Sequence, residues 1–401
     1  MNESIKAVHL AHTDGVCSDV TAFDSGVTAR AVAFHQGLPD YAPTPLADLK
    51  RLAAGLGLGR LAVKDESGRF GLNSFKGLGA SYAVARYLAQ RLRLSEGEMT
   101  YENLTKPEHR DQLRKVTLVT ATDGNHGRGV AWAARELGQN AVVHMPKGTT
   151  QTLLENIQKL GAKVDILDLN YDDCVRQAAK EAAATPRGVI VQDTAWDGYE
   201  DIPGWIMQGY GTMALEAAEQ IKAQSAERPT HVFVQAGVGS LAGAVIGFYA
   251  NLWSDNPPTF VVVEAKAADC LYEGALAGDG KIRTVGGDME TIMAGLACGE
   301  PNTISWDILK NHVKLFVAIS DDVAADGMRM LAAPIKGDPP ITSGESGAAS
   351  FAALMALMTD DACEEPRALL GLDRDSRVLV FSTEGDTDPE RYREIVWEGQ
   401  F

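Results

Sequence analysis

The 401-residue sequence predicts an α/β protein built on open, mostly parallel β-sheets flanked by helices. Short, nearly all-apolar runs recur along the chain, and stretches of helical periodicity separate them. Strands of a parallel sheet have this composition because helices cover both faces of the sheet. The predicted strands cover residues 61–64, 116–119, 141–144, 163–167, 189–192, 232–235, 260–264 and 378–382, and the clearest helical patterns cover residues 150–160 and 172–184.

Composition and charge exclude several classes of protein. A formal net charge of −17 argues against nucleic-acid and anionic-membrane partners, because both need a clustered basic surface. The most apolar stretch, residues 234–252, is broken by Gly and Ser and reads as a strand and a helix rather than a membrane span. No basic start precedes an apolar run, so we expect no secretory signal. We therefore expect a cytoplasmic protein with no membrane or nucleic-acid partner.

A lysine lies at the mouth of the first strand-loop-helix unit. Lys76 belongs to the sequence Asn-Ser-Phe-Lys-Gly of residues 73–77, between the predicted strand 61–64 and an apolar helical pattern. Open α/β sheets place their chemistry at such loops. A lysine amine can join the aldehyde of pyridoxal phosphate, and small neighbours let the flat ring lie close to the backbone. Taken alone, an ordinary surface lysine is the alternative.

A polar loop follows the second strand. Residues 120–127 read Thr-Ala-Thr-Asp-Gly-Asn-His-Gly and precede a helical pattern. The backbone N–H groups of such a loop and the helix N-terminus can hold a carboxylate. The amide of Asn125 can reach a ring hydroxyl with either end. A plain strand-to-helix turn, which also favours Asp, Gly and Asn, is the alternative.

Two later strands also end in candidate binding segments. Residues 235–243, Gln-Ala-Gly-Val-Gly-Ser-Leu-Ala-Gly, can present bare N–H groups to a phosphate. The spacing differs from a dinucleotide fingerprint, although Glu264 ends the next strand at about the expected distance. With Lys76 upstream, a single phosphate fits better. The last strand delivers Thr383, whose hydroxyl can face a pyridine nitrogen; an ordinary strand end is an equal alternative.

In this order the four segments resemble the fold-type II pyridoxal-phosphate enzymes, the superfamily of tryptophan synthase β and threonine dehydratase. Longer motifs resemble the diaminopropionate ammonia-lyases within it, among them Thr-Asp-Gly-Asn-His-Gly-Arg-Gly at 122–129, Gln-Asp-Thr-Ala-Trp at 192–196 and Ser-Gly-Glu-Ser-Gly at 343–347. The likeness runs from about residue 35 to the C-terminus. It implies two sheets, with a small domain (96–195) inserted into a large one (1–95 plus 196–401), and a homodimer.

The resemblance implies pyridoxal 5′-phosphate as cofactor and elimination of ammonia from D- or L-2,3-diaminopropionate, or both, giving pyruvate and two ammonia. A serine/threonine-type dehydratase, or another β-eliminating enzyme of this fold, is the nearest alternative. A nucleotide-binding regulatory protein that uses the glycine-rich loop is the alternative from another class.

The resemblance also implies roles for individual residues. The expected cofactor-binding residues are Lys76, Phe75, Asn125, Gly237, Val238, Gly239, Ser240, Leu241, Glu345 and Thr383. The expected substrate-binding residues are Ser74, Thr122, Asp123, Gly124, His126 and Asp193. Lys76, Asp123 and Asp193 are the expected catalytic residues. Dehydratases tend to carry a small or hydroxylated residue in place of Asp123, and a carboxylate there can attract a cationic side chain or move protons. A turn or helix cap remains the alternative for Asp193, and a structural role for His126.

The five cysteines are scattered, and neither C-x-x-C nor H-E-x-x-H occurs, so we expect no metal site. Cys270 and Cys298 both lie in segments that carry the resemblance. A disulfide between them would contribute roughly 3–4 kcal/mol before any strain. Two reduced, packed thiols are the default in the cytosol, and the sequence leaves both states open.

Overall fold

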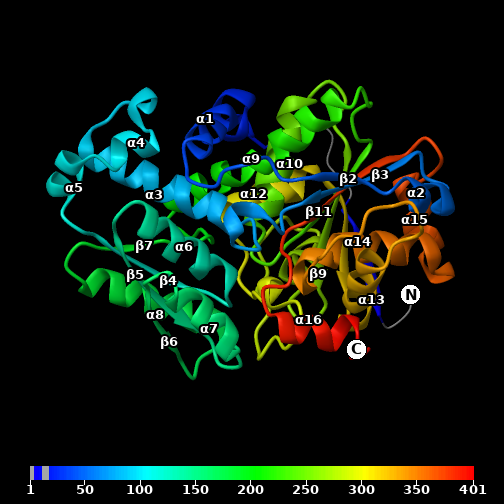
Figure 1. The fold of residues 1–401 in the computed structure, drawn as a ribbon. Coiled ribbons are helices and arrows are strands. Elements are labelled where there is room, and N and C mark those ends of the chain that lie inside the picture. Colours follow the sequence, from blue (N-terminus) through cyan, green and yellow to red (C-terminus); the bar gives the residue numbers. More distant parts are fainter. Residues whose placement is uncertain (1–3, 11–17) are drawn as a thin grey trace.

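The structure is a computed structural model that describes residues 4–10 and 18–401 (Figure 1). Its strands form a seven-stranded sheet in the order β1-β10-β9-β8-β11-β3-β2 and a four-stranded sheet in the order β6-β5-β4-β7. The strands are β1 (Ile5–His9), β2 (Leu46–Asp48), β3 (Arg60–Asp65), β4 (Thr117–Ala121), β5 (Asn140–Met145), β6 (Lys163–Ile166), β7 (Gly188–Ile190), β8 (His231–Gln235), β9 (Thr259–Ala265), β10 (Val313–Ile319) and β11 (Arg377–Ser382).

Both sheets are mostly parallel, as the apolar runs predict. The four-stranded sheet is parallel throughout. In the larger sheet only β1, against β10, and β2, against β3, run antiparallel. Each of the eight predicted strands is present. The sequence prediction lacked β1 and β2, which are short edge strands, and β10, whose apolar run is interrupted by Lys314.

Helices cover both sheets. The α-helices are α1 (Ser25–Gln36), α2 (Lys50–Leu56), α3 (Lys76–Leu92), α4 (Tyr101–Leu104), α5 (Pro107–Leu113), α6 (Asn125–Glu136), α7 (Gln151–Gln158), α8 (Tyr171–Ala184), α9 (Asp201–Ala223), α10 (Ser240–Leu252), α11 (Cys270–Ala277), α12 (Thr303–His312), α13 (Asp321–Ala332), α14 (Glu345–Thr359), α15 (Glu364–Leu370) and α16 (Pro389–Val396). Short 3₁₀ turns are η1 (Thr21–Phe23), η2 (Arg69–Gly71), η3 (Glu96–Glu98), η4 (Ala294–Leu296) and η5 (Asp361–Cys363).

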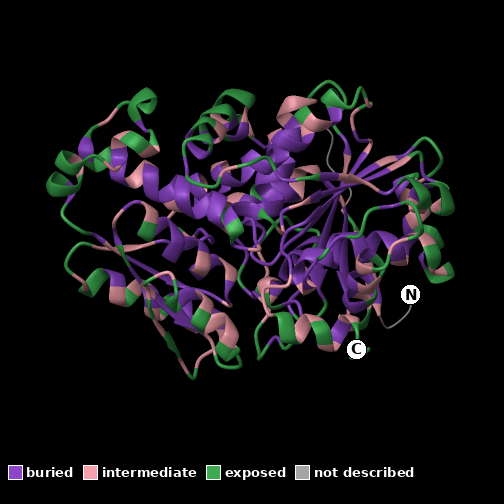
Figure 2. Cartoon of the chain, viewed as in Figure 1, coloured by how far each residue is buried: buried purple, intermediate pink, exposed green. Residues whose placement is uncertain are grey.

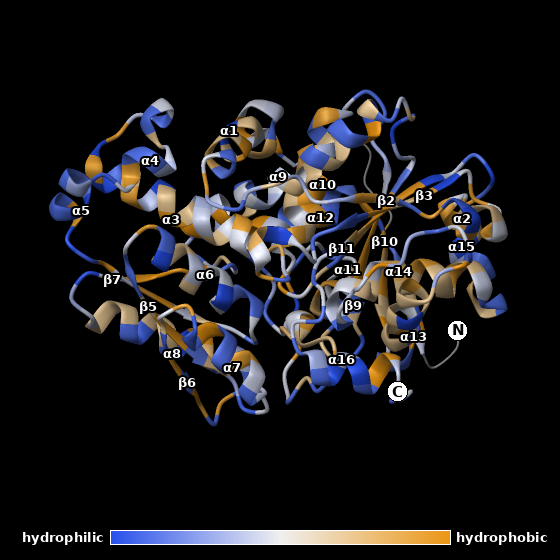
Figure 3. Ribbon diagram, in the orientation of Figure 1, coloured by the Kyte–Doolittle hydropathy of each residue, from blue (hydrophilic) through white to orange (hydrophobic). Residues whose placement is uncertain are grey.

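The larger sheet is buried on both faces, because successive side chains of a strand point to opposite faces. Val232 and Val234 of β8 pack in the same cluster as Phe248 of α10. Phe233, between them, packs in a second cluster with Phe351 of α14. The inner strands of this sheet, β3, β8, β9, β10 and β11, are accordingly mostly buried and hydrophobic, and large parts of α3, α9 and α10 are buried as well (Figures 2 and 3).

The four-stranded sheet, with α6, α7 and α8, forms a separate layered unit at the lower left of Figure 1. Its strands span residues 117–190, inside the range 96–195 expected for an inserted domain, whereas the seven-stranded sheet draws only on residues outside that range. The charged stretch 94–114, expected as a surface excursion, forms η3, α4 and α5. The exact domain limits, 1–95 plus 196–401 and 96–195, stay a prediction.

The described residues contain four cysteines, all free thiols: Cys174, Cys270, Cys298 and Cys363. Cys270 Sγ lies 3.5 Å from the carbonyl oxygen of Cys298, so the two residues are neighbours without a disulfide. Within the described ranges no group of three or more His, Cys, Asp or Glu side chains could hold a metal ion. In the same ranges, no helix has both the length and the apolar character to cross a membrane.

Candidate active site

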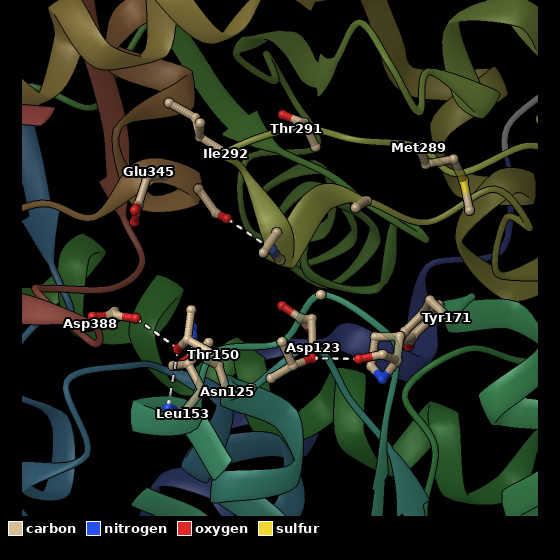
Figure 4. Close-up of a pocket in the computed structure, with 18 of the residues that line it drawn as sticks. Asp123, Asn125, Thr150, Leu153, Tyr171, Met289, Thr291, Ile292, Glu345 and Asp388 are labelled. Carbon is tan, nitrogen blue, oxygen red and sulfur yellow. Dashed lines mark hydrogen bonds between the residues drawn. The ribbon is translucent and has the colours of Figure 1, made fainter. Parts of the chain in front are cut away.

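Two adjoining hollows lie where loops from both sheets meet. The outer hollow encloses about 610 Å³, and Figure 4 shows the side chains around it. The inner hollow encloses about 50 Å³ and contains Lys76. The residues that line both are Asp123, Asn125, Tyr171, Gly295, Ser346 and Glu384. Most of the predicted site residues line one hollow or the other, although the chain brings them from loops far apart in sequence.

Lys76 begins α3, and its Nζ contacts Oδ2 of Asp193, in the loop after β7. The amine also lies over two aromatic rings, 5.2 Å from the centroid of Phe75 and 5.7 Å from that of Tyr210. Burial favours the neutral amine, but the negative charge of Asp193, with smaller contributions from Tyr210 and Asp123, outweighs it and raises the pKa of Lys76. The lysine is therefore held as a cation beside a carboxylate.

Asp193 lies at the centre of a buried cluster. Its Oδ2 is 3.7 Å from Nδ1 of His126 and 3.5 Å from the Tyr210 hydroxyl. Burial alone would raise its pKa, but His126, Lys76 and the hydrogen bond from Lys76 lower it to about 2. The carboxylate thus stays ionised and faces the lysine. This arrangement favours the functional interpretation of Asp193 over a turn cap.

His126 is fixed by the fold. Its Nε2 lies 2.8 Å from the carbonyl oxygen of Val191, while its Nδ1 is buried and has no hydrogen-bond partner. Burial lowers the pKa of the imidazole. His126 also lines the inner hollow. The bond to Val191 fits a structural role and the place in the hollow fits substrate binding, so both interpretations stay open.

Asp123 follows β4, and its side chain lines both hollows. Burial raises its pKa to about 7, and the positive charge of Lys76 only partly opposes this shift. Gly124, at φ 159°, caps the start of α6 and lines the outer hollow. In Figure 4 Asp123 and Asn125 point into the outer hollow from its lower wall.

Two predicted substrate contacts support loops instead of lining either hollow. The hydroxyl of Thr122 accepts hydrogen bonds from the backbone N–H groups of Gly124 and Gly127, both at 2.9 Å. The hydroxyl of Ser74 accepts one from the backbone N–H of Lys76 at 3.3 Å. Both side chains are buried, so they shape the loops that present Asp123 and Lys76.

The glycine-rich loop before and at the start of α10 lines the inner hollow. The five predicted residues of this loop all line the hollow: Gly237, Val238, Gly239, Ser240 and Leu241. A Cβ added at Gly237 would lie 3.1 Å from both the Sγ of Cys298 and the carbonyl oxygen of Gly295, so a side chain there would require these neighbours to shift. Bare N–H groups at a helix N-terminus form a ready site for phosphate.

Two further predicted residues, Thr383 just after β11 and Glu345 at the start of α14, line the inner and the outer hollow respectively. The Thr383 hydroxyl accepts a hydrogen bond from Nε2 of Gln235 at 2.9 Å and keeps its own proton to donate. Glu345 lines the outer hollow only, pointing down into it in Figure 4. Burial, with a contribution from the carboxylate of Glu384, raises the pKa of Glu345 to about 8.

Several site residues escaped the sequence-based prediction. They are Tyr171, Tyr210, Gln235, Gly295, Cys298, Ser346 and Glu384. Glu384 directly follows the predicted residue Thr383, and this adjacency was the available signal. Tyr210 lies within the long helix α9, and nothing in a single sequence separates it from a core tyrosine.

Comparisons with known proteins agree with this geometry. The family model of pyridoxal-phosphate-dependent enzymes matches residues 38–372. The chain is 50% identical over 387 residues to the diaminopropionate ammonia-lyase of Salmonella typhimurium, covering 96% of each sequence. It belongs to the diaminopropionate ammonia-lyase family. The crystal structure of the Escherichia coli family member in complex with D-serine superimposes with a TM-score of 0.92 at 45% identity, covering 99% of this chain and 97% of that one. A second structure of that enzyme, in complex with an aminoacrylate-pyridoxal-phosphate intermediate, gives a TM-score of 0.90.

Membership of the diaminopropionate ammonia-lyase family confirms the predicted fold class and pyridoxal 5′-phosphate as the cofactor. The residues present fit this group. An amine (Lys76), a glycine-containing loop at a helix N-terminus (237–241) and a neutral hydroxyl (Thr383) line one hollow. The contact of each residue with the cofactor stays a prediction.

Proposed function

We propose that the protein eliminates the β-amine of 2,3-diaminopropionate as ammonia. The aminoacrylate released is hydrolysed, so that one diaminopropionate and one water give one pyruvate and two ammonia. The observation that carries this proposal is the placement of two carboxylates, Asp123 and Asp193, around the amine of Lys76. A substrate with a second, cationic amine suits this surplus of negative charge better than serine does.

Bound pyridoxal phosphate supplies an electron sink for the pair left when the Cα proton is removed. Lys76 holds the cofactor through its amine and, once the substrate amine has replaced it there, accepts the Cα proton. Asp193, with a pKa of about 2, stays negatively charged beside Lys76. It can therefore stabilise a positive charge there, but it is a poor proton donor. Asp123, with a pKa of about 7, can both lose and gain a proton near neutral pH.

The loop between β4 and α6 is the proposed site of the substrate carboxylate. The hydroxyl of Thr122 already occupies the N–H groups of Gly124 and Gly127. The first-turn N–H groups of Asn125 and His126 are therefore the donors that this helix start offers.

A substrate panel tests the proposal. Purified holoenzyme is incubated with D- and L-diaminopropionate, D- and L-serine and L-threonine, and both oxo-acid and ammonia are measured. We expect two ammonia per pyruvate from diaminopropionate. Faster oxo-acid formation from serine or threonine, at one ammonia per oxo-acid, would establish the dehydratase alternative instead.

The variant Lys76→Ala tests the placement of the chemistry. It should abolish turnover and lose its visible absorption on dialysis, because the covalent link and the base disappear together. It should stay folded, since the amine lies in a hollow and not in the core. A variant that kept its absorption and formed pyruvate at a near wild-type rate would disprove the site assignment.

The homodimer and the cytoplasmic location implied by the resemblance are part of the proposal. Sedimentation of the holoenzyme at several concentrations measures the first, and fractionation of cells followed by immunodetection measures the second.

A further inference from the structure

One carboxylate, that of Glu384, joins three elements around the inner hollow. It lies two residues beyond the end of β11 and is 5% exposed. Its Oε1 accepts hydrogen bonds from the backbone N–H groups of Ser346, at 2.8 Å, and Gly347, at 3.2 Å, at the start of α14. Its Oε2 accepts one from Nδ2 of Asn125, the first residue of α6. The larger sheet and the smaller unit thus meet at this side chain.

The contact determines how the Asn125 amide is turned. An asparagine amide offers an acceptor at one end and two N–H donors at the other, and an ionised carboxylate only accepts. Both carboxylate oxygens of Glu384 accept hydrogen bonds from N–H donors, Oε1 from Ser346 and Gly347 and Oε2 from Asn125. Burial raises the pKa of Glu384, and these donors only partly oppose the shift. Glu384 therefore selects the orientation in which Nδ2 faces it. One N–H of Nδ2 is used in this contact, and the second remains free to donate.

We infer that Glu384 is a positioning residue that holds Asn125 with an N–H, and not its carbonyl oxygen, toward the ring oxygen of the cofactor. Asn125 lines the inner hollow together with Lys76, Thr383 and Glu384. An ionised ring oxygen accepts hydrogen bonds and does not donate them, so an Asn125 turned the other way would repel it. The inference rests on the ring contact expected of Asn125.

The variant Glu384→Gln tests the orientation with almost no change in shape. The two N–H groups of α14 would hold the oxygen of the new amide, which leaves its NH₂ group facing Asn125. Two NH₂ groups cannot face each other in a hydrogen bond, so Asn125 must turn its Oδ1 toward residue 384. The donor to the ring oxygen is then lost while the size and packing of the residue are kept.

The readout is the cofactor, without substrate. We expect Glu384→Gln to shift the visible absorption band of the holoenzyme and to weaken cofactor binding about tenfold, the effect of one charge-assisted hydrogen bond. Asn125→Ala should produce the same shift and a similar loss. The double variant should behave like Asn125→Ala alone, because both changes remove one contact.

Other outcomes overturn the inference. An unchanged spectrum and affinity in Glu384→Gln would mean that Asn125 does not depend on Glu384. If the losses of cofactor affinity in the two single variants added up in the double variant, Glu384 would act independently of Asn125, by holding the start of α14. If Glu384→Gln does not fold, a neutron crystal structure of the wild-type holoenzyme, which locates the amide hydrogens, decides. Nδ2 of Asn125 within hydrogen-bond distance of both Glu384 and the ring oxygen supports the inference, and an amide turned away from Glu384 refutes it. No substrate is used, so an error in the proposed reaction would leave these results unaffected.

Discussion

Asp123 and Asp193 lie near the same lysine, yet their surroundings move their pKa values in opposite directions. Burial dominates at Asp123 and raises its pKa to about 7. At Asp193 the charges of His126 and Lys76 outweigh burial and lower the pKa to about 2. A pair of like groups with separated pKa values is a common way to divide proton transfer from charge stabilisation. Asp123 is accordingly the residue to test as a base.

Asp123→Asn should distinguish the two enantiomers of diaminopropionate. In the proposed site Lys76 would lie on one face of the cofactor and take the Cα proton of one isomer, so the mirror image would need a base on the other face. Asparagine keeps the size of Asp123 but cannot accept a proton. We expect the D-isomer rate to fall by a factor on the order of 10² to 10⁴ and the L-isomer rate to fall less, as measured by pyruvate formation with each pure isomer.

Two results would contradict this role. Equal losses with both isomers would make Asp123 a shared substrate anchor or an acid for the leaving amine. No loss with either would leave it as a turn residue before α6.

The pH dependence of the D-isomer reaction follows from the same pKa. A carboxylate must be ionised to act as a base. The kcat/KM for the D-isomer should therefore be low below pH 7 and rise through about pH 7, which is the pKa of Asp123 in the substrate-free protein. Asp123→Asn should flatten this rise, while the wild-type profile with the L-isomer serves as the control. An unchanged rise in the variant would assign the titration to another group.

At the scale of an element, the start of α10 shows why the glycine-rich loop needs glycine at residue 239. Gly239 has φ +99°, and a Cβ there would lie 3.2 Å from Cβ of Ser305 and 3.3 Å from Cδ1 of Leu309, both on α12. A larger residue at this position would therefore meet both a strained left-handed backbone and a crowded neighbour. The close packing of α10 on α12 therefore depends on this glycine.

Gly239→Ala should lower the free energy of unfolding by about 2–4 kcal/mol, the sum of backbone strain and overpacking. Gly57→Ala is the matched control, because Gly57 also has a positive φ (+72°) but nothing within 4 Å of its added Cβ. The control should lose only about 1 kcal/mol. Urea denaturation of both variants measures the difference, and equal losses would show that crowding by α12 contributes nothing.

At the scale of the whole molecule, a buried ionic network ties α9 to the larger sheet. Glu216 of α9 accepts from Nζ of Lys64 on β3 and from Nη2 of Arg69 in η2, both at 2.7 Å. Arg69 also pairs with Glu66 through Nε at 2.8 Å. These side chains are almost fully buried, so each charge depends on its partners. Arg69 lies seven residues before Lys76, and the network therefore anchors the segment that leads to Lys76, the proposed catalytic lysine.

Removing one partner should destabilise the fold strongly. Glu216→Gln would leave Lys64 and Arg69 undercompensated, and we expect a loss of about 3–5 kcal/mol at neutral pH in urea denaturation. Asp255→Asn is the control: it removes an ion pair in which Asp255 is 78% exposed, and it should leave stability unchanged. A similar small effect in both variants would show that the network adds no stability.

The network also predicts an acid dependence. The pKa of Glu216 is lowered from 4.5 to about 2 in the folded protein, despite burial, by its hydrogen bonds and charges with Arg69 and Lys64. A carboxyl group whose pKa is lower in the folded than in the unfolded protein stabilises the fold at pH values above its unfolded-state pKa. This stabilisation is lost as the pH falls toward the folded-state pKa. Wild-type stability should therefore drop by about 3 kcal/mol from this group between pH 4.5 and 2, a component that Glu216→Gln should lack.

The sequence by itself determined the features that depend on neighbours along the chain. Apolar runs predicted eight of the eleven strands formed by the described residues, because a buried parallel strand needs apolar side chains on both faces. Local sequence also identified three candidate parts of the site: Lys76, the loop at 120–127, and Gly237 with Gly239. Each stands at a strand-to-helix junction, where local composition shows what the backbone can present.

The tertiary structure alone decided which distant groups meet. Asn125 and Glu384 are 259 positions apart, and only the packing of the smaller unit on the larger one joins them. The same packing places Tyr210 beside Asp193. Burial and neighbouring charge then separate the pKa values of Asp123 and Asp193, two residues of identical chemistry. These properties depend on distance and solvent exclusion, which the order of residues along a chain does not specify.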